Sequence, residues 1–192
     1  MSDILGKFSQ FAIVFILFIY QEASNSMKKR LIQLTASAWL IAMSAPALAI
    51  EAGQNAPDFE LAGRNGALHL SDYKGKTVYL DFWASWCGPC KQSFPWMNDM
   101  QARYGAKGLR VVGINVDQKT EDAKNFLNET PAKFDVAFDA AGKTPKTYAI
   151  KGMPTSVLIG PDGKVLMVHS GFKDEHRAEL EQHIKRALNL KD

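Results

Sequence analysis

The sequence predicts an α/β fold in which a central mixed sheet is flanked by helices, and two observations support this class. Between residues 77 and 138, apolar segments of strand length alternate with segments of helical periodicity, which is typical of parallel strands joined by helices. Within 56–70 and 155–168, pairs of short strand-like segments enclose glycine-containing turns and predict antiparallel hairpins. We therefore expect a sheet with a parallel portion and an antiparallel edge.

The first 49 residues have the pattern of a targeting segment. Met27-Lys28-Lys29-Arg30 is positively charged, residues 31–43 are mostly apolar, and Ala47-Leu48-Ala49 matches an A-x-A cleavage site. We expect a signal peptide over residues 27–49, cleavage after Ala49 and export to the periplasm. Because no cysteine lies near this site, a lipid anchor there is excluded.

Residues 1–26 precede this signal. A start-like Met27 followed by a complete signal peptide predicts that they are an upstream extension from a misassigned start codon. The alternative is an uncleaved membrane anchor. The apolar run over 11–20 has only ten residues, whereas a helix needs roughly 20 to span a bilayer.

Cleavage leaves residues 50–192, a chain of 143 residues, which suits one domain with a full core. The whole chain has 23 Lys and Arg against 20 Asp and Glu, and the mature part has a net charge of +1. This balance gives no reason to expect nucleic acid as a partner, and we expect a monomer. Export places the cysteines in an oxidising compartment, where a reductant needs an outside source of electrons.

Strand-like segments open the mature chain. Ala56–Leu61 and Ala67–Leu70 alternate in polarity around Gly63-Arg64-Asn65-Gly66 and predict an N-terminal β-hairpin. Thr77–Trp83 is apolar on both faces, as expected for a central strand covered by helices on both sides. Asp81 interrupts this strand.

The rest of the chain alternates helices and strands. Thr120 is the expected N-cap of one helix. This helix and the strand after it form an inserted αβ segment between Lys119 and Ala140. The expected elements are a helix over 88–104, a buried strand over 109–116, a helix over 120–129, a strand over 134–138, a short helix over 143–148, hairpin strands over 155–159 and 164–168, and an amphipathic terminal helix over 174–190.

Cys87 and Cys90 are the only cysteines and lie where the predicted strand gives way to a helix beginning at Gly88. Cysteines at this spacing can form a small reversible disulfide, so the motif predicts redox chemistry. Unsatisfied N–H groups and the positive end of the macrodipole favour thiolate at a helix start, which makes Cys87 the expected nucleophile. Pro89 suits the first turn, where its missing N–H has no helical partner. Cys90, one turn in, is the expected resolving cysteine.

Two structural alternatives remain open for the cysteine pair. A buried structural disulfide would suit an exported protein, although so short a loop restricts the unfolded chain little. Half of a zinc site would need two further ligands. The histidines offer no second ligand pair at finger spacing, so we expect neither a metal nor another cofactor. These histidines are His69, His169, His176 and His183.

Five motifs occur together along the mature chain. They are Ala56-Pro57-Asp58-Phe59, Leu70-Ser71-Asp72-Tyr73-Lys74-Gly75-Lys76, Phe82-Trp83-Ala84-Ser85-Trp86-Cys87-Gly88-Pro89-Cys90, Pro95 and Gly152-Met153-Pro154-Thr155. In this combination the sequence resembles the TlpA/ResA-like exported thiol-disulfide oxidoreductases of the thioredoxin superfamily. The resemblance covers about Ala56 to Leu190 and implies a thioredoxin-like fold. The N-terminal hairpin and the inserted αβ segment separate the chain from plain thioredoxins.

The resemblance implies a cis peptide bond before Pro154, with the Met153-Pro154 segment lying against the cysteine pair. A cis X-Pro bond exposes neighbouring backbone groups that can pair with an extended client peptide. We therefore expect a client-binding surface around the disulfide. Its expected members are Trp86, Gly88, Pro89, Met153, Pro154 and Thr155.

Thioredoxins have a buried aspartate at the position matching Asp81. The resemblance implies that Asp81 accepts the Cys90 proton, since burial raises the pKa of a carboxyl group toward neutrality. A solvent-facing aspartate is the alternative. The family pattern is broken at Ser93, where many TlpA/ResA-like proteins carry glutamate, and at Gly113, where thioredoxins place a lysine. Without that cation we expect Asp81 to be harder to ionise.

We expect a periplasmic enzyme that reduces protein disulfides through a mixed disulfide at Cys87, because Gly88-Pro89 is the dipeptide of reducing thioredoxins. The resemblance implies electrons from a membrane thiol carrier and clients such as apocytochrome c or another exported protein. Two other functions stay open. A peroxiredoxin-like peroxidase would need threonine or serine at the position of Ala84. A copper-binding module would use the cysteine pair for metal alone, without support from a nearby histidine.

Overall fold

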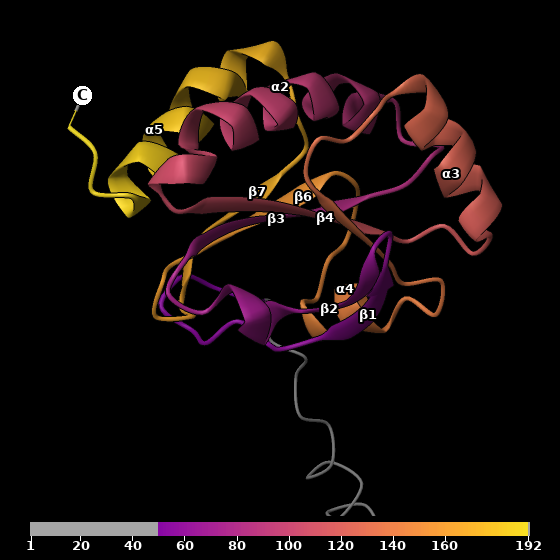
Figure 1. Ribbon diagram of the computed structural model, residues 1–192, viewed down its shortest axis with the longest axis horizontal. Helices are drawn as coiled ribbons and strands as arrows, with labels where there is room; N and C mark the ends of the chain where they lie inside the picture. Colours follow the sequence, from indigo (N-terminus) through magenta and orange to yellow (C-terminus); the bar gives the residue numbers. More distant parts are fainter. Residues whose placement is uncertain (1–49, 192) are drawn as a thin grey trace, which may run out of the picture. The chain divides into compact units, whose positions relative to one another are not determined.

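Within the described residues, 50–191, seven strands form one mixed sheet with helices on both faces (Figure 1). The structure is a computed structural model, and the predicted signal peptide and N-terminal extension lie outside the residues that it describes. The strands are β1 (Glu60–Gly63), β2 (Gly66–His69), β3 (Thr77–Trp83), β4 (Leu109–Asn115), β5 (Asp135–Phe138), β6 (Thr155–Ile159) and β7 (Val165–Ser170). The helices are α2 (Gly88–Tyr104), α3 (Thr120–Glu129), α4 (Lys143–Thr147) and α5 (Arg177–Ala187), with short 3-10 segments η1 (Leu70–Tyr73), η2 (Gly105–Lys107) and η3 (Asp174–His176).

The sheet has the order β2-β1-β5-β4-β3-β6-β7. Its centre is parallel, because β3 pairs with β4 and β4 pairs with β5 in the same direction. Strands β6 and β7 continue it in antiparallel fashion on one side, and the β1–β2 hairpin joins antiparallel to β5 on the other. The predicted mixed sheet and N-terminal hairpin are therefore confirmed.

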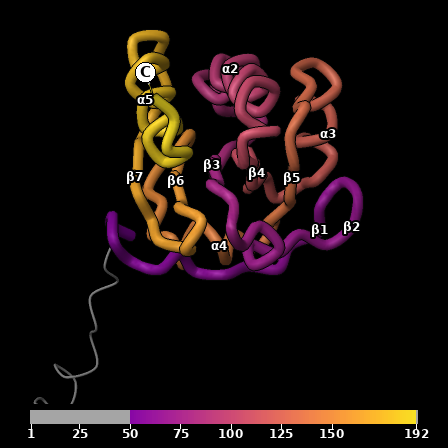
Figure 2. The backbone as a smooth tube through the Cα atoms, turned by 60° about the vertical axis from the view of Figure 1, so that its left-hand side comes forward, coloured from indigo at the N-terminus to yellow at the C-terminus, as the bar shows by residue number. Residues whose placement is uncertain are grey.

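Two apolar cores fill the space between the sheet and its helices. Figures 1 and 2 show α2, α3 and α5 on one face of the sheet, and α4 on the other. Every residue of β3 and β6 is buried, because neighbouring strands and both helical layers cover them. Alternate residues of β3 therefore face different cores: Tyr79 and Trp83 face α2, whereas Leu80 and Phe82 face the opposite layer.

Some ends of helices were predicted wrongly from the sequence. Thr120 is the first residue of α3 rather than its N-cap, which is Lys119. The Asp122 N–H donates to the Lys119 carbonyl oxygen at 3.1 Å, so backbone rather than the Thr120 hydroxyl satisfies this donor. The terminal helix is also shorter than expected: η3 precedes it, and Asn189, with φ of 54°, lies just beyond its C-terminal end.

The first hairpin strand begins later than expected. Ala56 donates its N–H to the Gly163 carbonyl oxygen at 2.9 Å, so the chain there follows the β6–β7 turn instead of β2. No helix within residues 50–191 combines the length and the apolar character needed to cross a membrane.

Candidate functional site

The two cysteines lie where β3 passes into α2, and they form a disulfide with an S–S distance of 2.02 Å. Cys87 is the N-cap of α2, and its Sγ accepts the Cys90 backbone N–H at 3.2 Å. The Cys87 residue is 4% exposed, whereas Cys90 is 0% exposed. Of the two cysteines, only Cys87 therefore has surface in contact with solvent. The N–H contact favours negative charge on the Cys87 sulfur when the pair is reduced.

The residues beside the disulfide form an exposed rim. Trp86 is the most exposed large apolar residue of the described chain, at 72%, and Gly88 and Pro89 are also exposed. A tryptophan held at the surface next to a reactive sulfur offers a large apolar contact area to another polypeptide.

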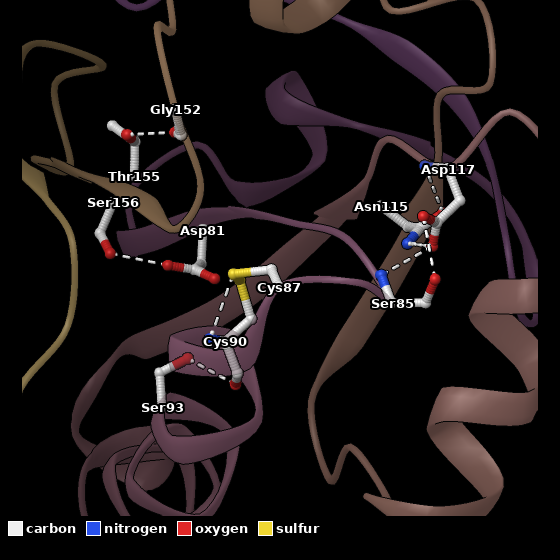
Figure 3. The surroundings of a disulfide bond; sticks show 10 residues. All are labelled: Asp81, Ser85, Cys87, Cys90, Ser93, Asn115, Asp117, Gly152, Thr155 and Ser156. Atoms are coloured by element: carbon white, nitrogen blue, oxygen red, sulfur yellow. Dashed lines mark hydrogen bonds between the residues drawn. A yellow bond between two sulfur atoms is a disulfide. The ribbon is translucent and has the colours of Figure 1, made fainter.

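The loop that carries Cys87 is held by Asp117, which follows the end of β4. The Asp117 carboxylate accepts hydrogen bonds from the Ser85 backbone N–H at 2.9 Å and the Ser85 hydroxyl at 3.1 Å. It also accepts one from the Asn115 side-chain amide at 2.7 Å (Figure 3). Since β3 and β4 are parallel, their C-terminal ends meet at one edge of the sheet. Asn115 and Asp117 were not identified from the sequence, although two polar residues just after a buried strand were a usable signal.

The Met153–Pro154 peptide bond is cis, as the resemblance implied. This segment lies at the C-terminal end of β3, because Thr155 pairs with Phe82 across β3 and β6. Met153 is half-buried, whereas Pro154 and Thr155 are buried. The Thr155 hydroxyl donates to the Gly152 carbonyl oxygen at 2.7 Å, so its hydrogen is used within its own loop (Figure 3).

Asp81 is buried beneath the cysteine pair, with only 1% of the residue exposed, so the solvent-facing alternative is wrong. Its Oδ1 accepts a hydrogen bond from the Ser156 hydroxyl at 2.7 Å, and its Oδ2 has no hydrogen-bond partner among the described residues. Figure 3 shows the carboxyl group pointing toward the disulfide. Burial raises the pKa of Asp81 to about 7, and the Ser156 hydrogen bond partly opposes this rise.

Gly113 lies directly beside Asp81 in the register of β3 and β4. A Cβ atom at Gly113 would come within 3.0 Å of Trp83 Nε1 and 3.1 Å of a Phe134 ring carbon. The place of a side chain is therefore filled by aromatic rings, and this position supplies Asp81 with no cation. The hydroxyl of Ser93 donates to the Cys90 carbonyl oxygen at 3.0 Å and so serves the backbone of α2.

The part of the chain that the structure describes offers no cluster of metal ligands. Among residues 50–191, no three His, Cys, Asp or Glu side chains gather closely enough to hold a metal ion. Two histidines do make contact, since His169 Nε2 lies 3.1 Å from His176 Nδ1.

Comparison with known proteins matches residues 51–184 to the Redoxin family model. The thiol-disulfide oxidoreductase ResA of Bacillus thuringiensis subsp. konkukian is 37% identical over 138 residues, which are 71% of this chain and 79% of the relative. ResA of Bacillus subtilis is 37% identical over 127 residues, 66% of this chain and 71% of the relative. A crystal structure from Chlorobium tepidum, described as a thiol:disulfide interchange protein DsbE, aligns with a TM-score of 0.72 and 58% identity, covering 73% of this chain and 99% of its own.

Proposed function

The chain belongs to the Redoxin family as a TlpA/ResA-like thiol-disulfide oxidoreductase of the thioredoxin superfamily, and from this we propose that it reduces protein disulfides in the periplasm. One observation carries the proposal. The Cys87–Cys90 disulfide joins the N-cap residue of α2, which is 4% exposed, to a second cysteine that is 0% exposed. This asymmetry gives the two cysteines different tasks.

The reaction begins with the reduced pair. The Cys87 thiolate, favoured by the N–H groups at the start of α2, attacks one sulfur of a client disulfide. An S–S bond forms between Cys87 and the client, and the other client sulfur leaves with the electron pair. The nucleophile and the client are then joined as a mixed disulfide.

Cys90 completes the turnover. Its thiol passes a proton to the Asp81 carboxylate, and the resulting thiolate attacks the Cys87 sulfur. The bond between Cys87 and the client breaks, the Cys87–Cys90 disulfide forms, and the client leaves as a dithiol. Two electrons have moved from the enzyme to the client, so an external dithiol must reduce Cys87–Cys90 before the next turnover. A pKa of about 7 makes the Asp81 carboxyl group able both to take and to release a proton near neutral pH.

The proposed client surface surrounds Cys87. Trp86, Gly88 and Pro89 are exposed on one side of it, and Met153 is partly exposed on the segment that precedes β6. Pro154 and Thr155 are buried, so their proposed contact with a client is limited to the backbone. Neither a metal nor another cofactor takes part in this scheme.

The wider setting follows from the predicted signal peptide and from the relatives. We propose that the mature protein is a monomer that receives electrons from a membrane thiol carrier. Exported proteins with disulfides, such as apocytochrome c, are the proposed clients. The N-terminal segment before the signal peptide would act as a membrane anchor only if it is translated and retained.

Insulin reduction and a redox titration of the cysteine pair test the proposal. Wild type is expected to reduce insulin with a dithiol as electron source, and Cys87→Ser is expected to have no turnover. Retained turnover in Cys87→Ser would exclude the exchange mechanism. A reduction potential as oxidising as that of DsbA, about −120 mV, would reverse the proposed direction. A peroxidase assay on the same samples separates this activity from peroxide reduction, which Ala84 does not support because it has no hydroxyl group.

A further inference from the structure

We propose that Ser156 and Tyr79 are positioning residues that fix the Asp81 carboxyl group and leave its Oδ2 atom directed at the cysteine pair. The proposal rests on the proposed role of Asp81 as acceptor of the Cys90 proton, and it deepens that role. It adds two hydroxyl groups, on separate strands, that neither the sequence motifs nor the disulfide geometry assign to the reaction.

The sheet register brings these groups together. Asp81 and Ser156 are direct partners across β3 and β6, so their side chains leave the sheet on the same face. Tyr79 is two residues before Asp81 on β3 and shares this face. Its hydroxyl donates to Ser156 Oγ at 2.8 Å, and Ser156 donates in turn to Asp81 Oδ1 at 2.7 Å. The three polar side chains therefore form one short chain of hydrogen bonds.

The direction of the chain follows from its donors and acceptors. A serine hydroxyl has one hydrogen and two lone pairs. Because Tyr79 occupies a lone pair of Ser156, the single Ser156 hydrogen is free to point at Asp81. Oδ1 is thereby occupied, and Oδ2 remains as the acceptor without a partner among the described residues. Figure 3 shows Ser156 on the side of the carboxyl group away from the disulfide.

The surroundings hold this arrangement in place. Tyr79 is 1% exposed, Ser156 is 3% exposed, and the Tyr79 ring packs edge-on against Trp96 with ring centroids 5.4 Å apart. Neither hydroxyl can exchange its partner for bulk water without disrupting the core. A donor to the carboxylate also favours its charged form and so limits the rise of the Asp81 pKa that burial causes.

Other titratable groups face this cluster from the elements packed on it. The N-terminal end of α2 contributes Cys87 and Cys90, whereas the residue of β4 beside Asp81 is Gly113, which has no titratable group. Strand β7 contributes His169, the register partner of Ser156, whose pKa is lowered by burial and by His176. A pH profile therefore needs a His169→Gln control, because histidine titrates just below neutral pH.

The experiment compares reduced wild type with Ser156→Ala, Ser156→Thr and Tyr79→Phe. The oxidation rate of each by excess insulin is followed from pH 5 to 9. Since a hydrogen bond to a charged group is lost, Ser156→Ala is expected to move the Asp81-dependent midpoint up by about one pH unit, which means about tenfold slower oxidation below that midpoint. Tyr79→Phe is expected to shift the midpoint the same way by less. Ser156→Thr, which keeps the hydroxyl, is expected to restore the wild-type profile.

Tyr148→Phe is the matched control for the tyrosine variant. Tyr148 is also 1% exposed, but its hydroxyl donates to the Pro57 carbonyl oxygen and its ring packs in the opposite core. It is expected to leave the profile unchanged. Carboxyl-carbon NMR of the oxidised proteins, with Asp81→Asn identifying the Asp81 signal, measures the Asp81 midpoint of the disulfide form without turnover, and Ser156→Ala is expected to raise that midpoint as well.

The outcomes separate this proposal from the proposed function. If Asp81→Asn oxidises at the wild-type rate at every pH, Asp81 is not the proton acceptor and both the role and its positioning fail. If Asp81→Asn is oxidised slowly but Ser156→Ala and Tyr79→Phe keep the wild-type midpoint in both measurements, the positioning role of Ser156 and Tyr79 is excluded. The proposed exchange reaction is then unaffected. A rate loss in Ser156→Ala that is equal at all pH values would indicate a structural role and would also overturn the proposal.

Discussion

Replacing Asp81 by asparagine should change the stability of the oxidised protein in a way that depends on pH, and the variant should gain on the wild type as pH rises. Burial raises the pKa of Asp81 from an ordinary value of 3.8 to about 7 in the folded state. Between these values the unfolded chain has released the proton and the folded protein has kept it, so the stability of the wild type falls as pH rises through this window. Above pH 7 the loss is complete.

The shift of roughly three pKa units corresponds to about 4 kcal/mol, at about 1.4 kcal/mol for each unit. Asparagine does not ionise, and its side-chain oxygen can accept the Ser156 hydrogen bond. Its amide lacks a partner in the place of Oδ2, which costs about 1–3 kcal/mol at every pH. The difference in unfolding free energy between Asp81→Asn and wild type should therefore change by about 4 kcal/mol in favour of the variant between pH 4 and pH 8.

Urea unfolding of both proteins at pH 4, 6 and 8, with the disulfide kept oxidised, measures this difference. Titrations elsewhere in the molecule are common to both proteins and cancel. Asp117→Asn is the control. The Asp117 carboxylate accepts three hydrogen bonds, from Ser85 and Asn115, and takes no part in the hydrogen-bonded chain of Tyr79, Ser156 and Asp81. A difference between Asp81→Asn and wild type that is the same at all three pH values would refute the reasoning.

Three further variants test other parts of the site. Asp117→Asn should lose about 1–3 kcal/mol of stability at pH 7, since one Ser85 donor is left without its acceptor; denaturant unfolding checks this, and a neutral result would remove the loop-holding role. Gly113→Ala should destabilise by about 1 kcal/mol because its methyl group would press on Trp83 and Phe134, and a stabilised variant would contradict this packing. Trp86→Ala should raise the KM for insulin severalfold while leaving reaction with a small aromatic disulfide unchanged; equal losses for both substrates would argue against a client contact.

Much of the fold was predictable because hydrophobic periodicity reports local structure. The residues of β3 and α2 were predicted without error, since continuous burial, a helix-starting proline and a closing glycine act within one segment. The N-cap of α3 was predicted wrongly at Thr120, because a backbone bond from Asp122 to Lys119 competes with the hydroxyl there. Local propensity at helix ends is weak compared with such bonds.

The candidate site was predictable only where its chemistry lies in one motif. Cys87 and Cys90 are three residues apart, so their pairing follows from spacing. Ser156 is 75 residues from Asp81, and their contact depends on the register between β3 and β6, which no local pattern reports. The same holds for Asp117 and Ser85, which meet only because β3 and β4 end at one edge of the sheet.

Trapping of mixed disulfides tests the division of labour between the two cysteines most directly. Cys90→Ser, reduced and mixed with insulin or with periplasmic extract, should accumulate a covalent complex through Cys87 that mass spectrometry detects and that dithiothreitol dissolves. Cys87→Ser should form none, because Cys90 is fully buried. A complex that forms equally well through Cys90 in the Cys87→Ser variant would contradict the assignment of Cys87 as the attacking sulfur.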